Sequence, residues 1–331
     1  MSERLRVLTW HVHGSYLWYL SHAPHDFYVP VKPGRPEGYG GRAGTLPWPD
    51  SLHEIAAEDV RNARFDCVLY QSQRNWLIDR GEILSDEQRR LPQIFLEHDP
   101  PREHPTDTQH IVDDPNVLLV HVTHFNALMW DNGHTPVRVI EHGVRVPGGI
   151  AYTGELTRGA VVVNGLRTRG RRLGADIFER VRAEVPIDIA GMGSEELGGE
   201  GDLSRERLAA FEARRRFFFN PIRYTSMGLA VCEAMMLGMP VIGLATTEMP
   251  AVIENGVSGY IDTDIGRLID VMRDLLSDPV QARALGEGAR RTAHERFAIE
   301  RFARDWDETL RYVAGPRPAR ALAGSGNGAT V

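Results

Sequence analysis

The sequence is poor in cysteine and contains no long apolar run. Its 331 residues include two cysteines, Cys67 and Cys232, each inside an apolar segment. Two isolated cysteines argue against a disulfide framework and exclude zinc-finger spacing, and they fit the reducing cytoplasm where we expect this protein. No stretch reaches the roughly 18 apolar residues of a spanning helix, so membrane association is expected to be at most peripheral. The N-terminal residues lack the apolar core of a signal peptide.

Lysine is almost absent, and negative charge exceeds positive charge. The net charge is −7, and Lys32 is the only lysine among 38 basic residues. An acidic chain argues against a nucleic-acid surface, so no nucleic-acid partner is expected. Arginines nevertheless cluster at 167–172 and at 214–216. Clusters of this kind in an acidic protein are more typical of a local anion site than of a groove for a polyanion.

The length and the apolar runs predict two α/β domains. A chain of 331 residues suits two domains of about 150 residues each. Short apolar runs alternate with helix-like stretches in both halves, which is typical of mainly parallel sheets. The expected strands are 6–10, 27–31, 67–70, 93–96, 117–120, 137–140, 161–163, 187–190, 217–219, 240–243 and 260–261. The expected helices are 16–20, 171–183, 205–213, 229–237, 265–276 and a stretch from 280 to 313 that breaks near 297–298.

Three stretches have weak periodicity. Turn-rich residues 144–152 place the link between the domains near residue 148. Residues 33–50 are rich in glycine and proline, and a long loop of this kind often carries function. Residues 315–331 have the composition of a disordered tail.

Residues 224–243 are the most informative segment for chemistry. A turn opens a helix at Gly228, and a helix N-terminus offers unpaired N–H groups and a positive dipole end to a phosphate. Glu233 follows on that helix, where a carboxylate could accept hydrogen bonds from a ribose diol. Thr246 and Thr247 follow the next strand, where backbone amides could again face an anion. The same spacing also fits an ordinary strand–turn–helix unit with an exposed glutamate.

This segment resembles the donor-binding signature of the retaining glycosyltransferases of GT-B fold, the GT4-like or group 1 family. Residues 233–242, Glu-Ala-Met-Met-Leu-Gly-Met-Pro-Val-Ile, follow the family pattern residue by residue, and 255–260 resemble its later turn. The resemblance implies an α/β protein with two Rossmann-like domains facing a cleft. Residues 1–148 would bind the acceptor, 149–300 would bind a nucleotide sugar, and a helix at 301–314 would pack back on the first domain.

The resemblance also implies roles for particular residues. The donor-binding set is Ser226, Met227, Gly228, Leu229, Glu233, Thr246 and Thr247, with Arg167, Arg169 or Arg172 at the diphosphate. Residues 95–99 resemble a strand end whose histidine faces the transferred sugar, so His98 and Asp99 are candidate catalytic residues. Gly14 and Ser15 resemble the glycine pair that opens the acceptor-side helix. Tyr39 and Arg42 in loop 33–50 are candidates for acceptor contact, unless that loop is a lid or plain surface.

The implied reaction moves a glycosyl group to an acceptor hydroxyl with retention and needs no metal and no cofactor besides the donor substrate. Its partners would be a nucleotide sugar and a glycan or small-molecule acceptor. One departure from the family lies at the site, because the family's first glutamate falls on Thr225. Threonine cannot stabilise a developing positive charge as a carboxylate would. Thr225 therefore predicts a deoxygenated or acidic donor, or slow transfer with common hexoses.

Three alternatives stay open. A relative that binds nucleotides or glycans without turnover would keep the fold, since fold does not prove activity. A sugar-nucleotide epimerase would use the same cleft. A metal-dependent hydrolase is the third, because His11 and His13 share one face of a strand end, with His98, Asp99, His121 and His124 as further ligands.

Overall fold

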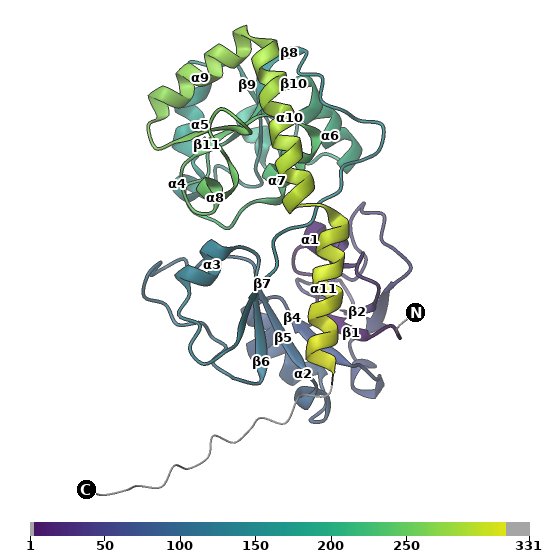
Figure 1. Cartoon of the computed structure of the whole chain (residues 1–331). Helices are drawn as coiled ribbons and strands as arrows, with labels where there is room; N and C mark the ends of the chain where they lie inside the picture. The colour runs from purple at the N-terminus through teal and green to yellow at the C-terminus, as the bar shows by residue number, and fades with distance from the viewer. Residues whose placement is uncertain (1–2, 316–331) are drawn as a thin grey trace, which may run out of the picture.

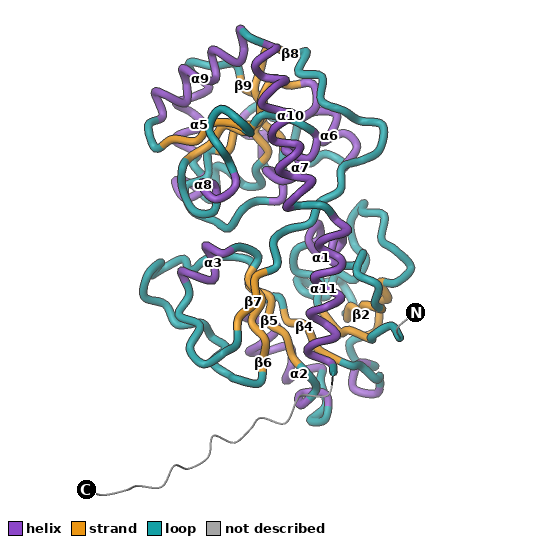
Figure 2. Tube along the Cα trace, in the orientation of Figure 1, coloured by secondary structure: helices purple, strands orange, loops and turns teal. Residues whose placement is uncertain are grey.

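The structure, a computed structural model, describes residues 3–315 and contains two parallel sheets, one in each half of the chain (Figure 1). The first sheet has the order β3-β2-β1-β4-β5-β6-β7, and the second has the order β12-β11-β10-β8-β9. Figure 2 shows helices and loops around the strands of both halves. The order reverses beside β1 in the first sheet and beside β8 in the second, and ligands of open α/β sheets bind at such points, beyond the carboxyl ends of the strands.

The first sheet contains β1 (Arg6–Thr9), β2 (Asp26–Val31), β3 (Leu52–Ala56), β4 (Cys67–Tyr70), β5 (Gln93–Glu97), β6 (Val117–His121) and β7 (Val137–Val139). Its helices are α1 (Gly14–Leu20), η1 (Val60–Asn62), η2 (Asn75–Asp79), α2 (Arg80–Ile83), η3 (Gln88–Arg90) and α3 (His124–Met129). The central strands β4 and β6 are buried at every residue, as expected for strands that are covered on both faces.

The second sheet contains β8 (Leu156–Val162), β9 (Ile187–Ala190), β10 (Arg215–Asn220), β11 (Val241–Leu244) and β12 (Gly259–Asp262). Its helices are α4 (Gly170–Leu173), α5 (Ala175–Arg182), η4 (Ser194–Leu197), α6 (Arg205–Arg214), α7 (Leu229–Leu237), α8 (Met249–Val252), α9 (Ile265–Ser277) and α10 (Pro279–Arg296). Helix α7 is apolar on almost every side because α6, α10 and the sheet all pack against it.

Every predicted strand is present with ends within two residues of the prediction, except that β8 begins five residues before the predicted start at 161. Strand β3 was not predicted, because only Leu52 of this edge strand is buried and no apolar run marks it. The predicted helix at 171–183 is divided into α4 and α5 at Gly174, whose φ is +83° and where a Cβ would collide with the Pro221 carbonyl. The predicted tail lies, apart from Gly315, outside the described residues.

The chain crosses between the two halves twice, and the two crossings lie against each other. One crossing follows β7, and the other joins α10 to α11 (Ile299–Ala314), which packs on α1 of the first half (Figure 1). The Val144 N–H donates to the Phe297 carbonyl at 2.9 Å. The Arg301 guanidinium donates to the carbonyls of Glu141 and His142 at 2.9 and 2.6 Å. We call residues 141–144 and 296–302 the hinge.

The packing of the hinge at Gly143 can be tested by substitution. A Cβ at this residue would overlap the Cβ of Phe302, which is backbone-proximal and cannot move aside. Gly143→Ala should therefore lower the free energy of unfolding by about 1–3 kcal/mol, the usual cost of overpacking. Chemical denaturation measures this difference. Gly148→Ala is the control, because a Cβ there meets no atom within 4 Å. Equal stability of the two variants would contradict the packing described for the hinge.

Candidate active site

The carboxyl ends of the two sheets face each other. Tyr224, which follows β10, donates its hydroxyl to the Pro101 carbonyl beyond β5 at 2.9 Å. The Phe125 N–H beyond β6 donates to Glu248 Oε2 beyond β11 at 2.8 Å. We call the region between these strand ends the interdomain site; it lies between the loops that follow β1, β4, β5 and β6 of the first half and the loops that follow β8, β10 and β11 of the second.

His98 lies at the centre of an aromatic cluster in the first half. Its ring centroid is 4.4 Å from that of His13 and 4.7 Å from that of Tyr16. The Gln71 amide nitrogen donates to Thr9 Oγ1 and the Trp10 carbonyl, which leaves Gln71 Oε1 to accept from His98 Nε2–H at 3.3 Å. Burial holds the pKa of His98 well below its usual value, and His13 adds to this shift. A neutral imidazole with its proton on Nε2 presents Nδ1 as an acceptor for a hydroxyl.

Arginines from both halves meet at the interdomain site. Arg102 forms an ion pair with Asp99 in the first half. Burial, with the nearby charges of Arg102 and Arg169, lowers the pKa of Arg172 from the second half, and Asp99 opposes this. Arg172 thus lies near two other guanidinium groups and one carboxylate, and this excess of positive charge suits an anion.

Arg167 does not share this location. It lines a separate surface hollow of about 400 Å³ on the second half, together with Asp176, Glu179, Arg182 and Glu196. Of the three arginines named for the diphosphate, the structure places Arg169 and Arg172 near Asp99, whereas Arg167 faces acidic side chains on the outer surface.

The loop between β10 and α7 carries the donor-binding candidates Ser226, Met227, Gly228 and Leu229. Gly228 caps α7 in an extended conformation and supplies no side-chain acceptor to the first N–H groups of the helix. His142 Nε2–H donates to the Met227 carbonyl at 2.6 Å, which ties this loop to the hinge. Burial lowers the pKa of His142 to about 4, so the ring is neutral and this hydrogen bond persists across physiological pH.

Glu233 lies on the second turn of α7 and contacts the first half. Tyr19 donates its hydroxyl to Glu233 Oε1 at 2.5 Å, and Arg205 lies 3.4 Å from the same hydroxyl. Burial raises the pKa of Glu233, while Tyr19 and Arg205 oppose that shift. Glu212 on α6 is 2% exposed, and burial with the neighbouring Glu233 charge raises its pKa well above the usual range. Burial thus favours the protonated form of Glu212.

The acceptor-side candidates differ in their placement. Gly14 and Ser15 open α1 at the site, beside His11. Tyr39 is fully buried in the core of the first half, so its side chain does not border the interdomain site. Arg42 is bound within its own loop, since its guanidinium donates to the Trp48 carbonyl at 3.1 Å and its backbone N–H donates to Glu54.

The histidines named for a metal are used in other contacts. His11 Nδ1 lies 2.6 Å from the Gly41 carbonyl, His13 packs on His98, and His121 Nε2 lies 2.8 Å from Asn132 Oδ1. Within residues 3–315, no group of three or more His, Cys, Asp or Glu side chains is arranged to hold a metal ion. The same residues contain no helix long and apolar enough to cross a membrane.

Thr246 and Thr247 follow β11 as predicted, and the backbone there is strained. Thr247 has φ of +53°, in the left-handed region that a β-branched residue rarely adopts. Such a conformation costs on the order of 1–3 kcal/mol and is typical of functional sites.

Sequence reasoning missed Glu248, the next residue, and also Tyr19, Gln71 and His142. Each acts through a partner far away in the sequence, so no local pattern marks it.

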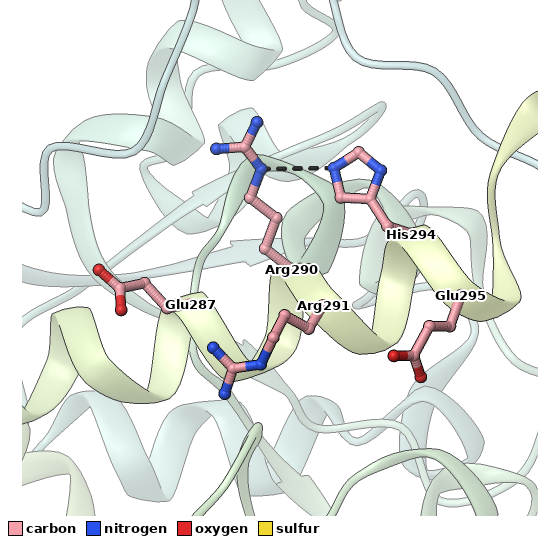
Figure 3. Close-up of a pocket in the computed structure, with 5 residues that line it drawn as sticks. All are labelled: Glu287, Arg290, Arg291, His294 and Glu295. Carbon is pink, nitrogen blue, oxygen red and sulfur yellow. Dashed lines mark hydrogen bonds between the residues drawn. The ribbon is translucent and has the colours of Figure 1, made fainter.

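A larger hollow, of about 520 Å³, lies away from this site. Figure 3 shows that its residues Glu287, Arg290, Arg291, His294 and Glu295 all belong to α10. Arg290 Nε lies 3.4 Å from His294 Nε2, the one hydrogen bond drawn between them. A depression along one exposed helix face does not bring together residues from different elements, and it contains none of the site residues.

Glu212 gives a test by pH. Because its folded pKa is raised, the folded state keeps a proton that the unfolded state loses above about pH 4.5. The unfolded state then binds fewer protons, so the stability of the wild type should fall by up to about 1.4 kcal/mol per pH unit above that value. Glu212→Gln is neutral in both states and should lack this loss. Unfolding free energies between pH 5 and pH 8 measure the difference, with the exposed Glu206→Gln as control. Parallel pH profiles for Glu212→Gln and wild type would contradict a protonated Glu212.

The second half of the chain matches a known family. Residues 176–278 fit the family model described as "Glycosyl transferases group 1". A stretch of 89 residues is 36% identical to the N-acetyl-alpha-D-glucosaminyl L-malate synthase of Bacillus anthracis, covering 26% of this chain and 23% of that protein. A stretch of 104 residues is 33% identical to the MMP alpha-(1->4)-mannosyltransferase of Mycolicibacterium hassiacum, covering 30% and 25%. The chain thus matches about a quarter of the length of these curated relatives.

Solved structures share the whole architecture. A sucrose-phosphate synthase from Thermosynechococcus elongatus superimposes with a TM-score of 0.67 over 93% of this chain and 98% of its own, at 14% identity. Anabaena Alr3699/HepE in complex with UDP and glucose gives a TM-score of 0.69 over 93% and 99%, at 13% identity. At such identities the likeness shows the fold. The chain therefore has the GT-B fold predicted from its sequence, and residues 176–278 of its second half match the family model of the glycosyl transferases group 1.

Proposed function

We propose that this protein is a glycosyltransferase that moves a sugar from a nucleotide-sugar donor to an acceptor hydroxyl. The observation that carries this proposal is the position of Arg172, which has the charges of Arg102 and Arg169 nearby and whose carbonyl accepts from the Tyr224 N–H, at 3.3 Å, in the loop that leads to the uncapped start of α7. Positive charge and free N–H groups at one point suit a diphosphate, whose charge grows as it leaves. The family match of the second domain supports the same reaction, and HepE, a structural neighbour, has been seen with UDP-glucose.

In this proposal the second domain binds the nucleotide, and the first domain contacts the sugar and the acceptor. Glu233 accepts hydrogen bonds from the ribose, and Arg169, Arg172 and the first N–H groups of α7 bind the diphosphate. The neutral ring of His98 orients the sugar from the other domain. Gly14 and Ser15 border the space for the acceptor, a glycan or a small molecule. The charge of the arginines would serve in place of a metal.

We propose that the transfer retains the configuration of the donor, as the family resemblance implies. The bond between the anomeric carbon and the diphosphate breaks, the bond to the acceptor oxygen forms, and the acceptor proton passes to the departing phosphate. The developing sugar cation is oxocarbenium-like. Asp99 is held by Arg102, and Thr225 carries no charge, so no carboxylate is placed as a nucleophile among these residues. For a retaining transfer we therefore propose attack from the face that the diphosphate leaves, rather than a double displacement through a glycosyl-enzyme.

A second candidate is a protein that binds nucleotide sugars without transferring them. The observation that favours it is Thr225, which supplies no carboxylate at the entry to α7. Thermal shifts with UDP, GDP, ADP and their common sugars test binding in both cases, since a ligand at a hundred times its Kd adds about 2.7 kcal/mol. Release of free nucleoside diphosphate together with a glycosylated product separates transfer from binding alone.

Glu233→Gln tests the ribose contact. The amide keeps the shape but loses a charge-assisted acceptor, so nucleotide affinity should fall by about 1.5–3 kcal/mol, roughly tenfold to a hundredfold in Kd. Titration calorimetry with the nucleotide that stabilises the wild type most measures this change. Glu287→Gln on the exposed face of α10 is the charge-matched control. Unchanged affinity in folded Glu233→Gln would remove Glu233 from the donor site.

His98→Ala tests the division of work between the domains. The imidazole is expected to contact the sugar and not the nucleotide, so kcat should fall about tenfold to a hundredfold while the Kd of the nucleotide changes little. His104→Ala, an exposed histidine a few residues away, is the control. Equal losses in kcat and nucleotide affinity would indicate instead that His98 is a packing residue.

A further inference from the structure

The interdomain site contains a buried carboxylate oxygen that has no partner within the protein. Glu248 is 3% exposed, and its Oε2 accepts from the Phe125 N–H across the two domains at 2.8 Å. Its Oε1 is buried and makes no hydrogen bond. Burying such an oxygen without a donor is costly, and the unsatisfied polar atoms of native proteins call for an explanation such as a bound group.

Glu248 borders the same site as the proposed catalytic residues. It follows β11, which pairs with β10, the strand that leads to Thr225. Its partner Phe125 follows β6, which pairs with β5, the strand that leads to His98. The ring of Phe125 lies 6.0 Å from that of Tyr224, whose hydroxyl bonds to Pro101. Glu248 is therefore one strand away from both His98 and Thr225.

The other carboxylates near this site already have partners or a proton. Asp99 pairs with Arg102, and Glu97 accepts from the Asp99 N–H and contacts His110 Nε2 at 3.2 Å. Glu233 accepts from Tyr19. Within residues 3–315 the other buried carboxylate oxygen without a partner belongs to Glu212, which lies on α6 and whose pKa is raised well above the usual range by burial and by the charge of Glu233. Among the carboxylates that border the site, Glu248 is thus the one with a buried oxygen that has no partner.

The backbone before Glu248 supports a functional reading. Thr247 holds a left-handed conformation with φ of +53°, although glycine would adopt it without strain. Strain of this kind persists where the surrounding structure fixes a side chain for a task. Here it precedes the one residue that reaches from β11 to the first domain through Phe125.

We propose that Glu248 Oε1 accepts a hydrogen bond from a hydroxyl of the transferred sugar and so determines which donors bind. This inference rests on the proposed function. It differs from the expectation drawn from Thr225, which is a deoxygenated or acidic donor or slow transfer with common hexoses. A buried carboxylate repels a sugar acid at close range and favours a neutral sugar whose hydroxyl can donate.

The test separates sugar binding from nucleotide binding. Calorimetry gives the Kd of UDP and UDP-glucose, and of GDP and GDP-mannose, for wild type, Glu248→Gln and Glu248→Ala. The ratio of the Kd of the free nucleotide to that of its sugar conjugate isolates the contribution of the sugar. We expect this ratio to fall about tenfold in both variants for the pair that the wild type binds. We also expect the affinity for UDP-glucuronate relative to that for UDP-glucose to rise by a similar factor in Glu248→Gln.

Controls make each outcome decisive. Glu254→Gln, an exposed glutamate just beyond α8, should leave the ratio unchanged, and melting temperatures show that each variant is folded. If both substitutions weaken the binding of UDP and of UDP-glucose by the same factor, Glu248 only joins the domains and the inference is overturned. If the wild type binds UDP-glucose and the ratio stays constant, the inference falls while the proposed function stands. If the wild type binds none of the four ligands, both fall together.

Discussion

The contact between the two chain crossings is the constraint on which the rest of the structure depends. The Val144 N–H donates to the Phe297 carbonyl, and the Arg301 guanidinium on α11 donates to the carbonyls of Glu141 and His142. These hydrogen bonds join the two segments of the hinge, so neither segment can move without the other. Helix α10 packs with α7, while α11 packs with α1. One nearly continuous helical stretch therefore belongs to both domains. His142 extends this constraint to the loop before α7, and the hinge thus fixes both the facing of the sheets and the place of the donor loop.

The two domains supply different chemistry to the region between them. The second domain supplies an uncapped helix start and arginines, which suit a group of high negative charge. The first supplies His98, a ring kept neutral by burial among other rings, which suits the orientation of hydroxyls rather than the binding of phosphate. Tyr19 and Phe125 reach across to Glu233 and Glu248. Because of these hydrogen bonds, the orientation of Glu233 and Glu248 in the second domain depends on the position of the first domain.

Local patterns in the sequence predict much of the fold and part of the site. Helix α7 is predicted to the residue, because glycines flank an apolar segment at 229–237. Strand β3 is not predicted, because this edge strand has no apolar periodicity. The burial of Tyr39 is not predicted either, because a glycine-rich loop has no periodicity that would indicate its contacts. The arginine cluster indicates an anion site, yet the sequence does not show that Arg167 lies in the outer hollow while Arg172 lies near Arg102. Glu248 has no local signal at all, since its partner lies more than a hundred residues away.

The most direct test of the central claim is a transfer assay on the purified protein. The protein is incubated with a nucleotide sugar that binds it and with a panel of acceptors that includes L-malate and simple glycosides. Free nucleoside diphosphate and glycosylated product are then quantified together, and the anomeric configuration of the product is read by NMR. The account predicts equal amounts of both products, with the configuration of the donor retained. Binding of the donor with no release of nucleoside diphosphate to any acceptor, or a product of inverted configuration, would contradict it.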